Sequence, residues 1–532
     1  MASEQNRLEY YAKVNTVRDL IDLAAERYGD KPFIKYLEGD EITEKSFSEL
    51  RSNSLALSRY IRSICPRRMH IAVIGKTTYE YITALTGTLV SGNVFVPFAP
   101  NISVREACEL FADGDVEALF YEADFDERAK EIAEKCPQLK TVVNMGDAEH
   151  FASIYSEYGE NSDCAPLSEV ELDPNDCAAI IYTSGTTGVR KGVMLSSKNL
   201  ISNVTYTELA LDPNDVMLSV LPMHHIFCIS CDYFKPLLDG ITVCLNGEIS
   251  NIGRSLATFK PTTMRAVPMI CDTLIKKVHM LHKKYPELTD RQAAELVFGE
   301  NFKWIAVGGA ALGKGLVADY EKHGIMLRQG YGMTEVSPKI STADFSDECK
   351  DSSGKILRSI GDVRIVDGEI QVKGSSVMMG YYKKPEETAK VFTEDGYLKT
   401  GDLGRITSSD HIYVTGRLKN LIILSNGENV SPEMLENKFA DEKVVKEIVV
   451  YGDKDRIVAE IFPDSEYAYA AGVSDIKNYL ESKAEQLNES EPEERRIAEI
   501  RLRDKPFEKT TTGKIKPVSY THLRAHETEA DL

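Results

Sequence analysis

The sequence predicts an α/β protein with a large N-terminal domain of two parallel-type αβ layers and a small β-barrel subdomain, followed by a small α+β C-terminal domain. Up to residue 307, apolar runs of strand length alternate with segments of helix length, which favours parallel sheets covered on both faces. After Glu335 the apolar runs shorten and turn pairs such as Asp367-Gly368 become frequent, which indicates a β-rich subdomain. The length of 532 residues exceeds one ordinary core, so two or more domains are expected.

Domain boundaries follow these changes of pattern. We place the large domain at residues 1–416, with its β-rich subdomain at 346–416, and the C-terminal domain at 417–517. Residues 518–532 resemble the in-frame translation of a sequencing adapter. We therefore exclude them from the prediction of fold and function, as one would exclude an expression scar.

The predicted elements alternate along the chain. In the large domain, helical periodicity marks 8–30, 46–64, 79–90 and 104–113, and strand-type runs mark 33–37, 70–75, 94–97 and 118–121. Ser46 and Glu49 form a capping pattern at the start of the second helix. A second set of such units spans 216–307. In the C-terminal domain we expect strands at 421–423, 448–451, 457–460 and 498–502, and helices at 432–439 and 474–487.

Bulk composition limits the partners and the location of the protein. The 63 basic and 83 acidic residues give a formal net charge of −20, which argues against nucleic acid and anionic lipid as partners, because both need a basic surface. No apolar run reaches the ~18 residues needed to span a bilayer, and the N-terminus lacks the apolar region of a signal peptide. The ten cysteines are therefore expected to be reduced thiols. We expect a cytoplasmic protein.

Two histidine pairs are candidate metal ligands. The adjacent His224 and His225 precede a Cys-x-x-Cys motif at 228–231, but a structural zinc site usually closes with a second ligand pair, and no other Cys-x-x-Cys exists in the sequence. Apolar packing with a role in a pocket is the better interpretation. His279 and His282 lie in a basic, helix-like stretch, and we interpret them as a solvated face.

A loop dense in hydroxyls and glycines is the strongest functional signal. It joins an apolar run at 177–182 to a second strand at 193–195, and it contains Thr183, Ser184, Gly185, Thr186, Thr187, Gly188 and Lys191. Glycines let the backbone approach an anion, hydroxyls and backbone N–H groups donate to phosphate oxygens, and lysine adds a positive charge. A plain turn between two strands is the alternative, but this density of donors favours a nucleotide phosphate loop.

A second glycine-rich segment, at 308–314, comes close to the Walker pattern. It fails because Gly315 stands where a Ser or Thr would hold Mg²⁺. The loop at 182–192 instead resembles the signature loop of the adenylate-forming superfamily, which includes acyl-CoA synthetases, luciferases and the adenylation domains of peptide synthetases. Six further segments match that superfamily, and together the motifs extend from residue 181 to residue 516.

The resemblance implies a role for each matching residue of the nucleotide site. The base would lie against the aromatic loop Gln329, Gly330, Tyr331, Gly332 and Met333 and the small-residue wall that contains Gly309 and Ala310. Thr334 would contact phosphate and Glu335 would bind Mg²⁺. Asp402 would accept both ribose hydroxyls, and Arg417 would lie near the ribose and the phosphate. Taken alone, each of these segments could be an ordinary turn.

The same resemblance assigns residues to the chemistry and to domain motion. Lys514, in a Thr-Gly-Lys-Ile pattern, matches the catalytic lysine, and Lys419 matches the hinge about which the small domain rotates. Taken singly, they could be a solvated lysine and a basic linker. His225 or His224 would lie beside the substrate carboxylate. The catalytic set implied by the resemblance is thus Lys514, Thr334, Glu335 and His225.

The implied reaction has two steps. A carboxylate attacks the α-phosphorus of ATP and expels pyrophosphate, with Mg²⁺ and cationic groups neutralising the charge of the transition state. The thiol of CoA then displaces AMP from the acyl-adenylate after the small domain has rotated. ATP, Mg²⁺ and CoA are therefore the expected cofactor and co-substrates, and the other partner is a small carboxylic acid.

The acid is expected to be a medium- to long-chain fatty acid. The aspartate that holds the amino group in peptide-synthetase domains has no counterpart near Phe227 and Cys228, so an amino acid is disfavoured. The segments at 331–338 and 426–432 resemble those of bacterial long-chain fatty acid–CoA ligases. An enzyme that loads an acyl carrier protein and a ligase for aryl or other acids remain alternatives. A non-catalytic binder of adenylates is disfavoured, because the catalytic motifs are intact.

Overall fold

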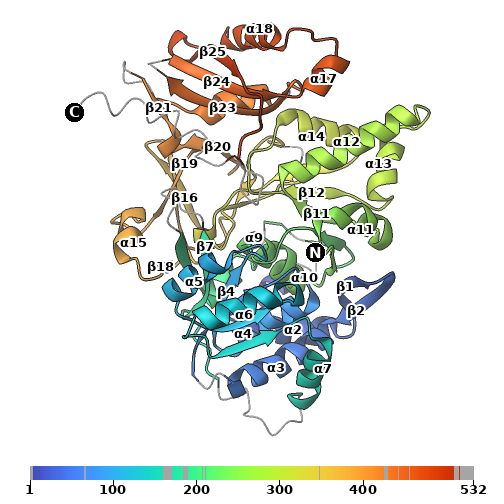
Figure 1. Ribbon diagram of the computed structural model, residues 1–532, viewed down its shortest axis with the longest axis vertical. Helices are drawn as coiled ribbons and strands as arrows, with labels where there is room; N and C mark the ends of the chain where they lie inside the picture. The colour runs from blue at the N-terminus through green and yellow to red at the C-terminus, as the bar shows by residue number, and fades with distance from the viewer. Residues whose placement is uncertain are drawn as a thin grey trace.

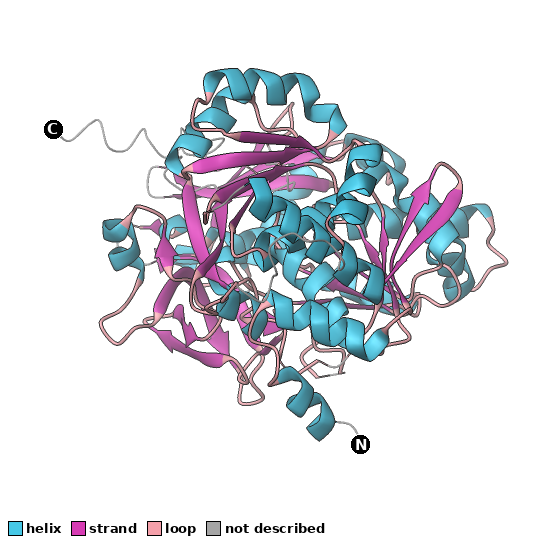
Figure 2. Ribbon diagram, turned by 90° about the horizontal axis from the view of Figure 1, so that it is seen from below, coloured by secondary structure: helices cyan, strands magenta, loops and turns pink. Residues whose placement is uncertain are grey.

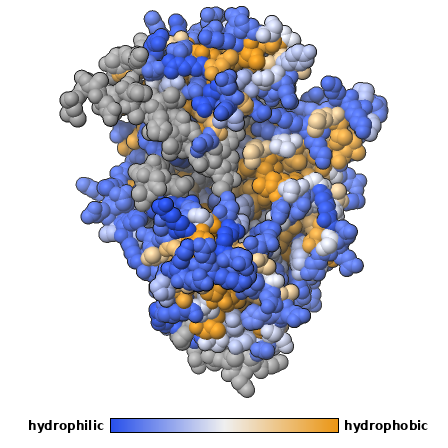
Figure 3. Space-filling model, in the orientation of Figure 1, coloured by the Kyte–Doolittle hydropathy of each residue, from blue (hydrophilic) through white to orange (hydrophobic). Residues whose placement is uncertain are grey.

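Two seven-stranded sheets form the framework of the large domain in the computed structural model (Figure 1). The structure describes residues 4–64, 67–159, 170–183, 190–206, 208–209, 211–346, 348–424, 429–440, 442–453, 456–489, 491–508 and 515. Among these residues, no helix combines the length and the hydropathy that crossing a membrane requires. The face shown in Figure 3 is mostly hydrophilic, in keeping with the acidic composition.

The first sheet has the strand order β13-β12-β11-β9-β10-β1-β2. Its strands are β1 (Pro32–Glu38), β2 (Glu41–Ser46), β9 (Val216–Ser219), β10 (Thr242–Leu245), β11 (Thr263–Ala266), β12 (Trp304–Val307) and β13 (Met326–Gln329). All neighbouring strands run parallel except the β1–β2 hairpin. Parallel strands present their carboxyl ends at one edge, so the loops after β12 and β13 lie side by side.

The second sheet has the strand order β18-β8-β7-β4-β3-β5-β6. Its strands are β3 (His70–Ile74), β4 (Val94–Phe98), β5 (Val116–Tyr121), β6 (Thr141–Asn144), β7 (Cys177–Thr183), β8 (Lys191–Ser196) and β18 (Gly380–Tyr381). The strands from β6 to β7 are parallel, whereas β8 is antiparallel to both of its neighbours. β18 reaches this sheet from far downstream in the chain.

Helices pack alongside both sheets (Figure 2). They comprise α1 (Glu4–Tyr11), α2 (Val17–Tyr28), α3 (Phe47–Ile64), α4 (Tyr79–Val90), α5 (Val104–Asp113), α6 (Asp126–Lys135), α7 (Ala148–Glu157), α8 (Ser197–Ser202), α9 (Ile226–Cys228), α10 (Lys235–Asp239), α11 (Ile252–Phe259), α12 (Pro268–Lys284), α13 (Asp290–Phe298) and α14 (Lys314–Lys322). The central strands are almost continuously buried, as β4 shows with all five residues buried. This burial explains why they read as unbroken apolar runs.

The β-rich region is an antiparallel sheet in the order β16-β17-β19-β20. Its strands are β16 (Gly361–Val366), β17 (Glu369–Gly374), β19 (Leu398–Ile406) and β20 (Ile412–Arg417), and α15 (Pro385–Val391) lies between β18 and β19 in the chain. The short pair β14 (Ser341–Thr342) and β15 (Lys355–Ile356) lies beside it through a bridge between Lys355 and His411.

The C-terminal part has a hydrophobic core of its own, which includes Phe439, Ile461, Leu480 and Ile500. Its three-stranded sheet consists of β23 (Val445–Asp453), β24 (Arg456–Pro463) and β25 (Ile497–Leu502), with β21 (Ile422–Ile423) and β22 (Asn429–Val430) as a separate pair. The helices are α16 (Pro432–Glu436), α17 (Ser465–Ala470) and α18 (Ile476–Asn488). In Figure 1 this unit lies at the top, in orange and red.

Several expectations about single elements were wrong or incomplete. The segment 8–30 is two helices, because Thr16 caps α2: its side chain accepts from Asp19 N, and Asp19 accepts in return from Thr16 N. The strands β2 and β18 and the helix α17 were not predicted. The predicted capping pattern is confirmed, since Glu49 N donates to Ser46 Oγ at 3.0 Å and Ser46 N to Glu49 Oε2 at 2.8 Å.

Candidate functional site

The two strands that flank the predicted phosphate loop form an antiparallel pair. β7 ends at Thr183 and β8 begins at Lys191, and these two residues face each other in register. Lys191 Nζ lies 2.7 Å from Glu387 Oε2 on α15 and 4.9 Å from the centre of the Tyr381 ring. The strands on both sides of the loop are thus as predicted, whereas Ser184, Gly185, Thr186, Thr187 and Gly188 lie outside the described residues.

The loop after β13 is fastened to the small-residue wall after β12. Gln329 Oε1 accepts a hydrogen bond from Leu312 N at 3.1 Å, and Gln329 Nε2 donates to Ala310 O at 3.3 Å. Gly330 N donates to the last carbonyl of β12 at 2.9 Å. Gly309 has a φ of +85°, in the left-handed region that favours glycine. Two segments that the resemblance assigns to the base are therefore adjacent.

Gly332 lies where the chain folds back on itself. It forms an antiparallel bridge with Lys339, and a Cβ at Gly332 would collide with the carbonyl oxygen of Pro338. Met333 N donates to the same carbonyl at 2.8 Å, and the Met333 side chain packs against the main core. The aromatic loop is therefore a tight hairpin that requires a residue without a side chain at this position.

Three residues that were predicted from separate motifs meet at one point. Tyr331 Oη donates to Asp402 Oδ2 at 2.8 Å, and Arg417 Nε lies 3.0 Å from Asp402 Oδ1. The register of β19 and β20 places Asp402 opposite Arg417, and Asp402 is only 5% exposed. Burial, reinforced by the charge of Asp402, raises the pKa of Tyr331 well above its usual value, so Tyr331 is a phenol that donates.

Glu335 lies in the turn Thr334–Val336, directly after this loop. Its Oε1 accepts a hydrogen bond from Tyr381 Oη at 2.9 Å, and burial raises the pKa of Glu335. Because the Tyr381 ring also lies beside the Lys191 ammonium, Tyr381 connects the foot of the phosphate loop to Glu335. Carboxylate oxygens are the ligands that a hard cation such as Mg²⁺ prefers.

His224 and His225 come directly before α9, and their ring centres lie 4.2 Å apart. Burial, with a smaller contribution from His225, lowers the pKa of His224 to about 3, and burial also lowers the pKa of His225. Both rings are therefore neutral near pH 7. Within the described part of the chain, the buried Nδ1 atom of His224 has no hydrogen-bond partner. A ligand oxygen could supply one.

Phe227 of helix α9 contacts the small-residue wall that follows β12. The Phe227 ring lies 2.9 Å from the position that a Cβ on Gly308 would occupy. Gly308 follows β12, so its lack of a side chain lets the aromatic ring close against the wall. The histidine segment therefore lies beside the glycine-rich segment that begins at Gly308.

The Cys-x-x-Cys motif packs into the core. Cys228 and Cys231 are 0% and 4% exposed, and burial raises the pKa of Cys228 well above its usual value. Cys228 Sγ donates to Leu221 O at 3.0 Å. Of the histidine, cysteine and carboxylate groups close enough to share an ion in the described residues, none includes this motif. The interpretation as apolar packing agrees with these contacts.

The junction between the large and small domains is formed by Arg417 and the turn Leu418–Asn420, which contains the exposed Lys419. Ser431 Oγ, at the start of α16, donates to Thr415 O on β20 at 2.8 Å. Lys514 lies outside the described residues. The next residue, Ile515, packs against Val449, Tyr451, Val458 and Phe507.

Tyr381 and Glu387 were missed by sequence reasoning. They lie in β18 and α15, within the region assigned to the β-rich subdomain, and neither belongs to a motif used for the prediction. Their contact with Lys191 depends on the pairing of β18 with β8, which no local pattern signals. Only the three-dimensional arrangement identifies them.

Comparison with known proteins identifies the class to which this fold and site belong. Residues 21–382 match the family model of the AMP-binding enzymes, and residues 419–523 match the model of the AMP-binding enzyme C-terminal domain. The first match alone spans more than half of the sequence. The chain therefore belongs to the AMP-binding enzyme family, and the predicted resemblance to adenylate-forming enzymes is confirmed.

Curated relatives carry more specific names. The chain is 29% identical over 431 residues to the long-chain-fatty-acid–CoA ligase FadD15 of Mycobacterium bovis, a match that covers 72% of this chain and 71% of the relative. It is 25% identical over 579 residues to the chloroplastic long-chain-fatty-acid–[acyl-carrier-protein] ligase AEE15 of Arabidopsis thaliana, with 88% of this chain and 78% of the relative covered.

Solved structures share the fold. ATP-bound MatB from Rhodopseudomonas palustris matches with a TM-score of 0.79 at 21% identity, covering 97% of this chain and 99% of MatB. The anthranilate CoA ligase AuaEII, in complex with anthranoyl-AMP, also gives a TM-score of 0.79, at 18% identity with 96% and 97% coverage. The predicted fold class, a large α/β domain followed by a small α+β domain, is confirmed.

Proposed function

We propose that this chain is an AMP-forming long-chain fatty acid–CoA ligase. It would join a fatty acid carboxylate to the α-phosphate of ATP, release pyrophosphate, and transfer the acyl group to the thiol of CoA with release of AMP. The observation that carries the proposal is the meeting of Tyr331, Asp402 and Arg417 beside the wall that Gln329 holds in place. The names of the relatives guide the choice of acid and thiol.

We place the ATP-binding part of the site around Asp402, Tyr331 and Arg417. Asp402 is nearly buried, yet its two oxygens offer more acceptor positions than Tyr331 and Arg417 fill, so ribose hydroxyls can bind there. The base would lie on the Tyr331 face, against the wall at Gly309 and Ala310. Arg417 would remain near the ribose and the α-phosphate, where its charge stabilises the transition state.

Charge neutralisation is the main catalytic demand, because an anionic carboxylate attacks an anionic phosphate. Lys191 lies at the end of the phosphate loop and forms an ion pair with Glu387, which it would exchange for phosphate oxygens when ATP binds. Thr334 supplies a hydroxyl, and Lys514 supplies the second cation. Glu335 would hold Mg²⁺, which contributes further positive charge when it is bound.

The acid end would be formed by His224 and His225. Because both rings are neutral, they can donate an N–H to the carboxylate without a cation that would hold the ground state too tightly. The nearest downstream carboxylate, Asp232, is 1% exposed and accepts from Ser219 Oγ at 3.0 Å. Its carboxylate is buried in the core between Ser219 and Arg265, which disfavours direct contact with the amino group of an amino acid substrate.

A second candidate is a ligase that loads an acyl carrier protein. The observation in its favour is the similarity to AEE15, which extends over more of this chain than the similarity to FadD15 does. Both candidates share the first half-reaction and differ only in the thiol. The tests therefore separate the two steps.

The first test is fatty-acid-dependent exchange of pyrophosphate into ATP without any thiol. We expect exchange with long-chain acids, and a loss of at least ~100-fold in Lys514→Ala, because that change removes a cation from the transition state. Lys505→Ala, a change of another C-terminal lysine, is the matched control and should keep full exchange. Exchange that is absent with every fatty acid but present with aryl acids would reject the proposed substrate.

The second test adds the thiol. Wild-type enzyme, ATP and the best acid are combined with CoA or with a holo acyl carrier protein, and the thioester is quantified. Acyl-CoA as the main product supports the proposal. Thioester on the carrier protein alone would establish the second candidate and reject CoA as the acceptor.

A further inference from the structure

Helices α12, α13 and α14 lie close together (Figure 1), and they carry a cluster of histidines and carboxylates that the proposed reaction does not use. His279 and His282 lie on α12, Asp290 begins α13, Asp319 lies on α14, and His323 caps the end of α14. The interpretation of His279 and His282 as a solvated face was incomplete, because each contacts a carboxylate from another helix.

Within the described residues, one ring nitrogen of His323 forms a hydrogen bond and the other forms none. The ring is 1% exposed, and its Nδ1 lies 2.7 Å from the main-chain oxygen of Asp319. A carbonyl oxygen carries no proton, so Nδ1 must be the protonated nitrogen, and the neutral ring then has a bare lone pair on Nε2. Helix capping explains the first contact. It does not explain Nε2, which has no hydrogen-bond partner within the described residues.

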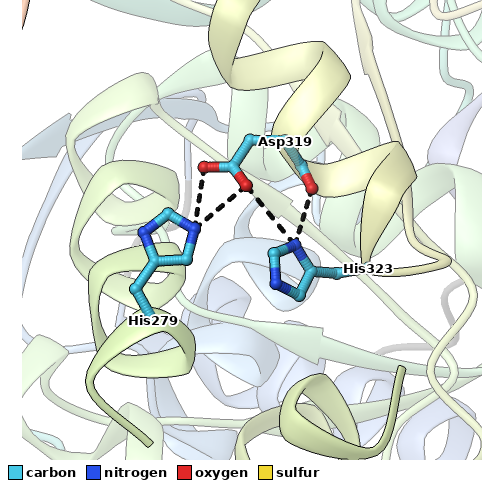
Figure 4. Close-up of side chains that lie close together, drawn as sticks. All are labelled: His279, Asp319 and His323. Carbon is cyan, nitrogen blue, oxygen red and sulfur yellow. Dashed lines mark hydrogen bonds and ion pairs between the residues drawn. The ribbon is translucent and has the colours of Figure 1, made fainter. Parts of the chain in front are cut away.

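The free nitrogen points away from Asp319 (Figure 4) and toward a second carboxylate. His323 Nε2 lies 3.8 Å from Asp290 Oδ1, which is too far for a hydrogen bond. His282 Nδ1 approaches the same oxygen to 3.3 Å, and the three ligand atoms all lie within 4.8 Å of one another. Two ligands at about 2.1 Å from a tetrahedral Zn²⁺ lie about 3.4 Å apart, so these atoms have nearly the spacing of ligands around one ion.

We infer that His282, Asp290 and His323 form a binding site for a divalent transition-metal ion, with Zn²⁺ the best match. Two imidazole nitrogens and one carboxylate oxygen form a donor set typical of Zn²⁺ and its first-row neighbours, whereas Mg²⁺ and Ca²⁺ prefer oxygen ligands. The Asp319 carbonyl fixes the tautomer of His323 in the way that outer-shell acceptors fix ligating histidines.

The neighbouring group of His279, Asp319 and the Nδ1 atom of His323 is not the proposed metal site. His279 Nε2 lies 3.0 Å from the Asp319 carboxylate, and His323 Nδ1 lies 3.4 Å from it, so the spacing alone would also fit an ion. However, the proton on His323 Nδ1 blocks coordination there. His279 thus serves as a natural control, one helical turn from His282 and in a similar environment.

The site has an open side and one competitor. A surface hollow of about 320 Å³, lined by His279, His282, Lys283 and Pro286, reaches the His282 side of the cluster. Lys322 Nζ lies 3.2 Å from Asp290 Oδ1, so a metal ion must displace its ammonium group. The Lys322 side chain is 63% exposed and can turn into solvent.

Metal binding is tested on the full chain without an affinity tag, after treatment with a chelator. Co²⁺ is followed by its visible absorption, and Zn²⁺ affinity is measured by competition with a chromophoric chelator. We expect one ion per chain, at least about 100-fold weaker binding in His282→Ala, unchanged binding in His279→Ala, and tighter binding in Lys322→Met. Zn²⁺ should also raise the melting temperature of the wild type but not of His282→Ala.

Two results would overturn the inference: wild-type affinity no greater than that of His282→Ala, or binding that is lost in His279→Ala and kept in His282→Ala. His282 is partly exposed, so its variant should fold even if a change at the buried His323 does not. His522 and His526 are present in every variant, so ions bound there cancel in the comparison.

Discussion

Asp402 contacts residues from two other motifs of the sequence. Its two oxygens bind Tyr331 from the loop after β13 and Arg417 from the neighbouring strand. Sequence motifs were sufficient to name these residues, because each motif is a short local pattern. Tyr381 and Glu387 could not be found in the same way, because their role arises from a strand pairing between distant segments.

Replacing Asp402 by Asn should weaken ATP binding. The Asn side chain would present an NH₂ group to one of the two donors, Tyr331 and Arg417. It also lacks the negative charge that would strengthen the hydrogen bonds from the ribose hydroxyls. Charged hydrogen bonds contribute about 1.5–3 kcal/mol, so KM for ATP in pyrophosphate exchange should rise roughly 10- to 100-fold. Asp395→Asn, which changes an exposed carboxylate of the same β-rich region, should leave KM unchanged. An unaltered KM in Asp402→Asn would contradict the ribose assignment.

The buried histidines predict a pH dependence of stability. An unfolded histidine takes up a proton near pH 6.5, whereas folded His224 does so at about pH 3. Between these values the unfolded state binds more protons, so the free energy of unfolding falls as the pH falls. Urea unfolding between pH 4.5 and 7 should show that His224→Gln reduces this slope by up to about 1.4 kcal/mol per pH unit. A slope equal to that of the wild type would contradict burial of a neutral ring.

Secondary structure was predictable where local patterns decide it. The helices α4 and α5 and the strands β3 and β4 lie where the apolar pattern predicted them. Their buried positions carry apolar residues, so the position of each element is visible in the sequence. The break between α1 and α2 was missed, since the capping contacts of Thr16 interrupt a periodicity that continues through it. β2 has one buried residue among its six, and β18 is only two residues long, so neither edge strand gives an apolar run of strand length.

The hairpin after β13 depends on Gly332. A side chain there meets the backbone of Pro338, which cannot move without opening the bridge to Lys339. Gly332→Ala should therefore lower the free energy of unfolding by about 1–3 kcal/mol and raise KM for ATP. In α11, Gly253→Ala meets only the flexible end of Lys277, so it should be neutral or slightly stabilising. Equal stability of the two variants in urea unfolding would show that the hairpin tolerates a side chain.

At the scale of the whole molecule, two units with separate cores are joined by a short turn. The fold class and the family were predictable from the order of elements and motifs. The contacts of α16 with β20 were not, because packing between units leaves little trace in either local pattern. The cluster at His282, Asp290 and His323 was missed for a similar reason, since its residues come from three helices.

Lys419→Pro tests the hinge at this scale. Proline fixes φ near −65°, which suits the turn that Lys419 occupies, so the variant should fold but hold one arrangement of the two units. We expect one half-reaction to fall by at least ~100-fold while the other stays within about threefold of wild type, when pyrophosphate exchange and thioester formation are measured separately. Lys419→Ala should retain both. Equal rates of both steps in the proline variant would reject the hinge assignment.

The pairing of β18 with β8 has a consequence for synthesis on the ribosome. β8 is made early, but its outer edge stays unpaired until residues 380–381 have been translated. An open strand edge is a template for pairing with other chains. A nascent chain that stalls before Tyr381 would thus expose the unpaired edge of β8, and Lys191 would lack its contacts with Tyr381 and Glu387. Translation of residues 380–387 would therefore cover part of this edge and supply Tyr381 and Glu387 to the site in the same stretch of chain.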